Sequence, residues 1–155
     1  MITIDFLLSP AWRAKNMGVN LASADNASLR YEVLLGDIIF KTGQCDLSAK
    51  WDWIPLIDFA TSLRQIVDEL IEKDGTETIY EFTESDATLE FKREGSAIIV
   101  SASYAPCHAI VPLVELAAAI DSFSRRILET ISREFPSLLQ NKILPRLLPV
   151  PLPGS

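Results

Sequence analysis

Cys45, Cys107 and His108 are the residues whose types could support nucleophilic or metal chemistry in this chain. His108 is the only histidine and directly follows Cys107. A catalytic Cys–His pair needs side chains that face each other, whereas neighbours in an extended strand point to opposite faces. Cys45 and His108 remain candidates to meet in space, either as a nucleophilic pair or, with Cys107 and an acid, as a zinc site.

Neither site is the expected outcome for these three residues. Structural zinc sites use four ligands in recognisable pairs, and the sequence contains no CxxC. Two cysteines are too few for a disulfide framework, and a cytosolic setting would keep both reduced. We therefore expect buried thiols and a loop histidine.

Carboxylates are concentrated between residues 68 and 94. This segment contains ten acidic and three basic residues, and the excess of seven acids equals the net charge of −7 of the whole chain. Paired carboxylates can hydrolyse glycosides in a cleft, but these alternate with apolar residues and so should face water. No GxGxxG, P-loop or GxSxG stretch occurs. We therefore expect no catalytic residues, no metal and no cofactor, and we do not expect an enzyme.

Two tryptophans and the acidic segment are instead candidates for binding another protein. Tryptophan is enriched at interface hot spots, although aromatic residues in connectors also serve as lids on a core. An acidic surface repels nucleic acid and attracts basic proteins; the alternative is a solvated face that keeps the protein soluble. The predicted partner-binding residues are Trp51, Trp53, Glu77, Glu81, Glu84, Asp86 and Glu90.

Two amphipathic helices must position these residues. Apolar residues recur at helical spacing over Pro55–Lys73 and Pro112–Phe135. Both helices begin with related stretches, IPLIDFA at 54–60 and VPLVELA at 111–117. Proline suits the first helical turn, and an acidic residue three positions later favours the positive end of the helix dipole. We interpret the repeat as a helix-start signature. It is explained either by a tandem duplication or by convergent spacing.

Strands are predicted at residues 2–8, at 29–35 and 37–42 around a turn at Gly36, and as a meander between 77 and 103. Loops are predicted after residue 8 and over 43–53. The resulting fold class is α+β: a two-layer sandwich in which both helices lie on one face of an antiparallel sheet.

One domain over residues 1–142 and a proline-rich tail over 143–155 account for the whole chain. The tail, ILPRLLPVPLP with Gly154 and Ser155 after it, should be extended and polyproline-like, with its leucines against the domain or another chain. No run of about 18 apolar residues and no basic leader occurs, so we expect no membrane segment and a cytoplasmic location.

The order of LRYEVLLGDIIF, WIPLIDFATSL, a three-strand meander and VPLVELAAAIDSF resembles small bacterial α+β domain families over about residues 28–135. Some of these families are similar to immunity proteins, the cytoplasmic antidotes encoded beside secreted polymorphic toxins. The resemblance implies a protein that binds one cognate toxin and occludes it. The alternative is a structural or assembly subunit of a phage or secretion system that forms a homo-oligomer through its tail.

Overall fold

The computed structural model describes residues 1–149 and divides them into two sheets and a set of helices. The elements are β1 (Ile2–Leu8), α1 (Pro10–Asn16), α2 (Asn26–Tyr31), β2 (Leu35–Thr42), β3 (Ala49–Pro55), α3 (Leu56–Glu72), β4 (Glu77–Glu81), β5 (Thr88–Glu94), β6 (Ala97–Ala102), β7 (His108–Pro112), α4 (Leu113–Glu134), the 3-10 helix η1 (Pro136–Gln140) and α5 (Leu144–Leu147).

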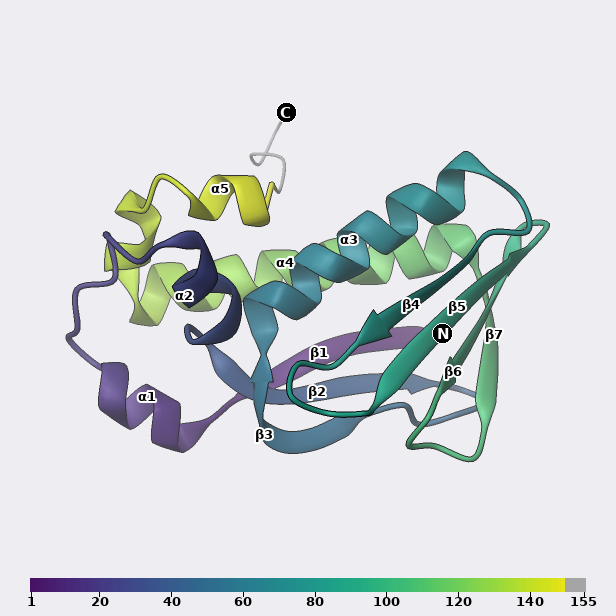
Figure 1. The fold of residues 1–155 in the computed structure, drawn as a ribbon, viewed down its shortest axis with the longest axis horizontal. Coiled ribbons are helices and arrows are strands. Elements are labelled where there is room, and N and C mark those ends of the chain that lie inside the picture. Colours follow the sequence, from purple (N-terminus) through teal and green to yellow (C-terminus); the bar gives the residue numbers. More distant parts are fainter. Residues whose placement is uncertain (150–155) are drawn as a thin grey trace.

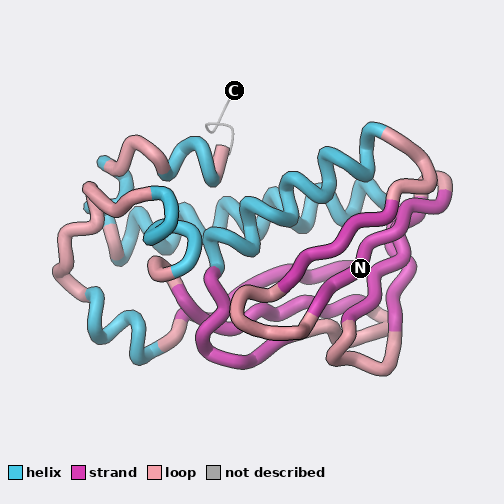
Figure 2. The backbone as a smooth tube through the Cα atoms, in the orientation of Figure 1, coloured by secondary structure: helices cyan, strands magenta, loops and turns pink. Residues whose placement is uncertain are grey.

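The α+β sandwich is confirmed, but the single expected sheet is two antiparallel sheets, β1-β2-β3 and β4-β5-β6-β7. The long helices α3 and α4 run side by side (Figure 1), joined by an ion pair of 2.6 Å between Arg64 and Asp121. Helix α4 packs along β1 and α3 along β4, so the helix pair spans both sheets. Figure 2 shows the strands gathered on one side of this helical layer. Among the described residues, no helix combines the length and the apolar character needed to cross a membrane.

Helices α3 and α4 begin in the same way, directly after a strand that ends in proline. Pro55 ends β3 and Pro112 ends β7, and each precedes the first helical residue rather than occupying it. The next residue donates its N–H to the loop before the neighbouring strand, from Leu56 to Leu34 O and from Leu113 to Ser96 O, both at 2.9 Å. The repeated stretch is therefore a strand-to-helix junction used twice, and the predicted helices are confirmed.

The first third of the chain differs most from expectation. Residues 29–31, predicted to begin a strand over 29–35, belong instead to α2, whose N-terminus is capped by the Asp25 carboxylate. Gly36 makes no turn; it lies inside β2, where a Cβ would collide with the carbonyl oxygen of Leu7 in β1. The predicted loop after β1 contains α1, which is capped by the Ser9 hydroxyl. The predicted 43–53 connector contains most of β3, and β7 was not predicted.

Residues 143–149 of the predicted tail fold back onto the domain instead of forming an extended polyproline helix. Leu144, Leu147 and Leu148 are buried, and the carbonyl of Leu147 accepts a hydrogen bond of 2.9 Å from Thr61 on α3. The buried Asn141 side chain donates to two carbonyls of the 17–25 loop and accepts from two N–H groups that open α5. The remainder of the predicted tail, including Gly154 and Ser155, lies outside the described residues.

Candidate partner-binding surface

A bulge in β3 places Trp51 and Trp53 beside each other. Between the pairs Gly36–Ile54 and Ile38–Ala49, four residues of β3 (50–53) lie opposite the single residue Asp37 of β2. Asp52 lies in this bulge with φ 68°, a left-handed conformation that aspartate tolerates because its short side chain bonds locally. Its N–H donates to the Asp37 carboxylate at 2.8 Å. The two indole rings stack at 5.6 Å with an interplanar angle of 23°.

The two tryptophans have different surroundings. Trp51 is half-buried and packs edge-on against Phe82 and Tyr104, each with a centroid distance of 5.1 Å. Phe82 follows β4, and Tyr104 lies in the β6–β7 connector. Trp53 is 39% exposed. Trp51 therefore acts as a core lid that joins the two sheets, and Trp53 is the more exposed of the two rings.

The predicted acidic residues lie on β4, β5 and the turn between them. Glu81 immediately precedes Phe82, and the segment from Glu81 to Thr88 lines a depression of about 570 Å³. Glu84 adopts φ 59° in this turn and, like Asp86, is exposed. Glu90 lies on the same outer face, one position diagonal to Glu81. We call Trp51, Trp53, Glu81, Glu84, Asp86 and Glu90 the acidic–aromatic surface.

The charges on this surface are largely uncompensated. Within the described residues, no basic group lies at ion-pair distance from any of its four acids. Glu77 differs: it lies at the far end of β4 and faces Lys92 at 3.4 Å. Glu77 is therefore not part of the surface; the other acids lie on β4, β5 and the turn between them, and the Trp51–Phe82 contact links the tryptophans to this region.

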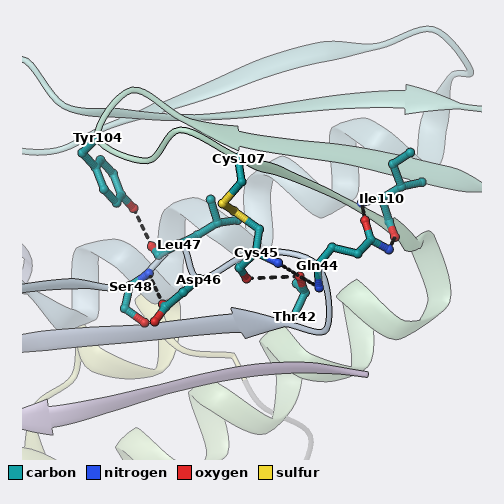
Figure 3. The surroundings of a disulfide bond; sticks show 9 residues. All are labelled: Thr42, Gln44, Cys45, Asp46, Leu47, Ser48, Tyr104, Cys107 and Ile110. Atoms are coloured by element: carbon teal, nitrogen blue, oxygen red, sulfur yellow. Dashed lines mark hydrogen bonds between the residues drawn. A yellow bond between two sulfur atoms is a disulfide. The ribbon is translucent and has the colours of Figure 1, made fainter.

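Cys45 and Cys107 are not free thiols. They form a disulfide across 62 positions of sequence, with their Cα atoms 5.7 Å apart (Figure 3). The bond joins the loop between β2 and β3 to the connector between β6 and β7, so it ties one sheet to the other. The expectation of reduced cysteines is therefore wrong in this structure. It failed because cysteine count and spacing alone do not reveal which loops meet in space.

His108 opens β7 and is exposed, so it lies at the start of a strand rather than in a loop. Because Cys45 and Cys107 are bonded to each other, neither can pair with His108 as a nucleophile or as a metal ligand in the disulfide state. Across residues 1–149, no group of three or more histidine, cysteine, aspartate or glutamate side chains is arranged to hold a metal ion.

Two groups in the connectors beside the disulfide support the aromatic cluster. The Tyr104 hydroxyl donates to Leu47 O at 2.8 Å. Burial, helped by the nearby charge of Asp46, raises the pKa of Tyr104 well above its ordinary value, so this donor keeps its proton. Hydrogen bonds from Ser48 lower the pKa of the Asp46 carboxyl and keep it charged. Tyr104 is therefore held beside Trp51 by a hydrogen bond from its neutral hydroxyl.

Asp58 is a buried charged residue outside the acidic–aromatic surface. Asp58 on α3 is 5% exposed and accepts from Arg30 Nε at 2.9 Å and Nη2 at 2.6 Å. The Tyr80 hydroxyl donates to its other oxygen at 3.2 Å. Burial and the adjacent Asp58 charge raise the pKa of Tyr80 far above its ordinary value. The hydrogen bonds that the Asp58 carboxylate accepts come from Arg30 on α2 and Tyr80 on β4. The three side chains therefore link α2, α3 and β4.

Phe82 and Tyr104 are the members of the site that the sequence did not indicate. Phe82 follows the alternating pattern of β4, which marks it as buried but not as a neighbour of Trp51. Tyr104 lies in SASYAPC, which has no periodicity. Their contacts depend on how the two sheets are placed, and no local pattern encodes that.

The candidate surface combines one exposed indole ring with four exposed carboxylates that have no ion-pair partner within residues 1–149. Aromatic anchors supply contact area with few rotatable bonds, and complementary charge guides encounter. Comparisons of the chain with protein-family models, with curated proteins and with solved structures found no match.

Proposed function

We propose that this chain is a binding protein of the immunity class, which neutralises a cognate bacterial toxin by occluding it with the acidic–aromatic surface. The observation that carries the proposal is the contact between Trp51 and Phe82, which links the stacked Trp51–Trp53 pair to the residue at which the acidic β4–β5 turn begins. A hydrophobic anchor next to unpaired charge is the combination from which interface hot spots are built.

The partner in this proposal is a basic protein. Four acids with no ion-pair partner in the described part of the chain create a local negative potential, which speeds association with a positive surface and penalises wrong partners. Nucleic acid is a poor ligand for the same surface, because its phosphates are repelled. The proposed location is the cytoplasm, where an antidote would meet its toxin before export.

The alternative is an assembly subunit that forms a homo-oligomer through its apolar tail. Leu144, Leu147 and Leu148 are buried against the chain's own core, so the described part of the tail leaves them no free area for a second copy. We therefore place the immunity class first.

Co-expression with the product of the adjacent gene tests the proposal. The wild-type chain should restore growth to cells that produce a toxic, basic neighbour. Replacing Glu81, Glu84 and Asp86 by lysine should abolish protection, since three attractive charges become repulsive. A neighbour that is harmless, or one that stays lethal beside the wild-type chain, would count against the immunity class.

A matched control separates local binding from overall charge. Asp68, Glu69 and Glu72 are exposed on α3, outside the acidic–aromatic surface. Replacing these three by lysine changes the net charge by the same amount and should leave protection intact. Equal loss in both variants would mean that only net charge matters, and that the proposed surface is wrong.

A further inference from the structure

The disulfide lies at a junction where the side-chain hydrogen bonds between the two connectors are few (Figure 3). The Gln44 side chain accepts from Ile110 N at 2.9 Å and donates to Ile110 O at 3.2 Å, so it covers the outer edge of β7. Both residues are exposed, and hydrogen bonds that compete with water contribute little net stability. The Tyr104–Leu47 bond is the third hydrogen bond across this junction. The covalent bond is therefore the strongest link in it.

This junction leads directly to the aromatic half of the acidic–aromatic surface. Tyr104 lies three residues before Cys107, and Leu47 lies two residues after Cys45. Tyr104 packs against Trp51 at 5.1 Å, and Trp51 in turn stacks on Trp53. Freeing the two connectors would loosen the side of Trp51 that faces Tyr104.

We propose that the Cys45–Cys107 disulfide is a redox-sensitive clamp, which fixes the Trp51–Trp53 pair when oxidised and releases it when reduced. The clamp is independent of any partner; only its effect on binding rests on the proposed function. A reducing cytosol favours the dithiol. The disulfide would form when the chain encounters an oxidant or leaves that compartment.

The exchange chemistry is thiol–disulfide exchange with a small-molecule or protein disulfide, RSSR. The Cys107 thiolate attacks one sulfur of RSSR, and RS⁻ leaves and takes up a proton. The Cys45 thiolate then displaces the second RS⁻ from the mixed disulfide on Cys107. Two thiols are oxidised, one RSSR is reduced to two RSH, and the protons lost by the cysteines appear on them. Cys107 is the entry point because it is partly exposed, whereas Cys45 is only 6% exposed.

The indole N–H signals of an NMR spectrum test the clamp without a partner. Trp12 provides an internal control, because its indole donates to Glu32 O at 2.8 Å and packs on Phe135, away from the disulfide. On reduction, confirmed by a mass gain of two hydrogen atoms, the Trp51 and Trp53 signals should shift or broaden while the Trp12 signal stays in place. Unchanged signals from all three rings in the reduced chain would overturn the proposal. So would a chain that gains no mass because it never formed the bond in an oxidising buffer.

The variant Cys45→Ser with Cys107→Ser separates the clamp from an effect of the reductant. Its spectrum should match that of the reduced wild type and ignore reductant; a match to the oxidised wild type would contradict the clamp. With the basic product of the adjacent gene as probe, the oxidised chain should bind at least about fivefold more tightly than the reduced chain. Equal affinities would remove the regulatory consequence, and no binding in either state would refute the proposed function while the indole signals still decide the clamp.

Discussion

Replacing Asp58 by asparagine removes the charge from the buried group that joins α2, α3 and β4. Asparagine keeps the size and one acceptor but leaves Arg30 without its counter-ion. Removing one partner of a buried pair costs about 3–5 kcal/mol of unfolding free energy. The Arg30 side chain is 22% exposed and so can regain some water, which places the expected loss at the lower end, about 3 kcal/mol.

Urea unfolding followed by circular dichroism measures this loss, and a thermal melt should show Tm falling by roughly 6–12 °C. Glu115→Gln is the matched control, because Glu115 occupies the same position in the second helix-start stretch but is exposed; it should cost no more than about 0.5 kcal/mol. Combining Asp58→Asn with Arg30→Met should cost at least about 1 kcal/mol less than the two single losses together. A loss below about 1 kcal/mol for Asp58→Asn, or one equal to that of the control, would refute the buried ion pair.

Three further predictions concern stability. Reduction of Cys45–Cys107, which are separated by 62 positions, should lower the free energy of unfolding by about 4 kcal/mol in a chain-entropy treatment; urea melts with and without reductant test this, and equal midpoints would contradict it. Asn141→Ala should cost about 2 kcal/mol, because it leaves buried donors and acceptors unpaired, and an unchanged melt would mean that water replaces the amide. Burial raises the pKa of Tyr80 and Tyr104, so above about pH 10 the unfolded chain releases protons that the folded chain keeps, and stability should fall as pH rises. Tyr80→Phe should flatten that fall, and an unchanged slope would argue against its burial.

Periodicity predicted the elements that have one wet face. Helices α3 and α4 and strands β4 to β6 were predicted because each repeats apolar residues at its own period over many positions. Helix α2 was missed because LRYEVLL is equally compatible with a strand. The residue that indicates a helix is Asp25, which caps α2 and lies directly before its first residue. Strand β3 was missed because its bulge breaks the alternation that would identify it.

Long-range placement is what the sequence could not supply. The division into two sheets, the Cys45–Cys107 pairing and the contacts of Tyr104 all depend on how the 42–48 loop meets the β6–β7 connector. Composition did indicate the acidic segment and the tryptophan pair as candidate binding residues. The link between the two regions is the Trp51–Phe82 contact, which joins residues 31 positions apart and which the sequence did not indicate.

Isothermal titration calorimetry with the purified basic product of the adjacent gene is the most direct test of the acidic–aromatic surface. The wild type and the α3 control (Asp68, Glu69 and Glu72 to lysine) should bind with similar affinity. The surface variant (Glu81, Glu84 and Asp86 to lysine) should bind at least about 30-fold more weakly, as expected for the loss of a hot spot. Equal affinity of the surface variant and the wild type would contradict the proposal that this surface recognises the partner.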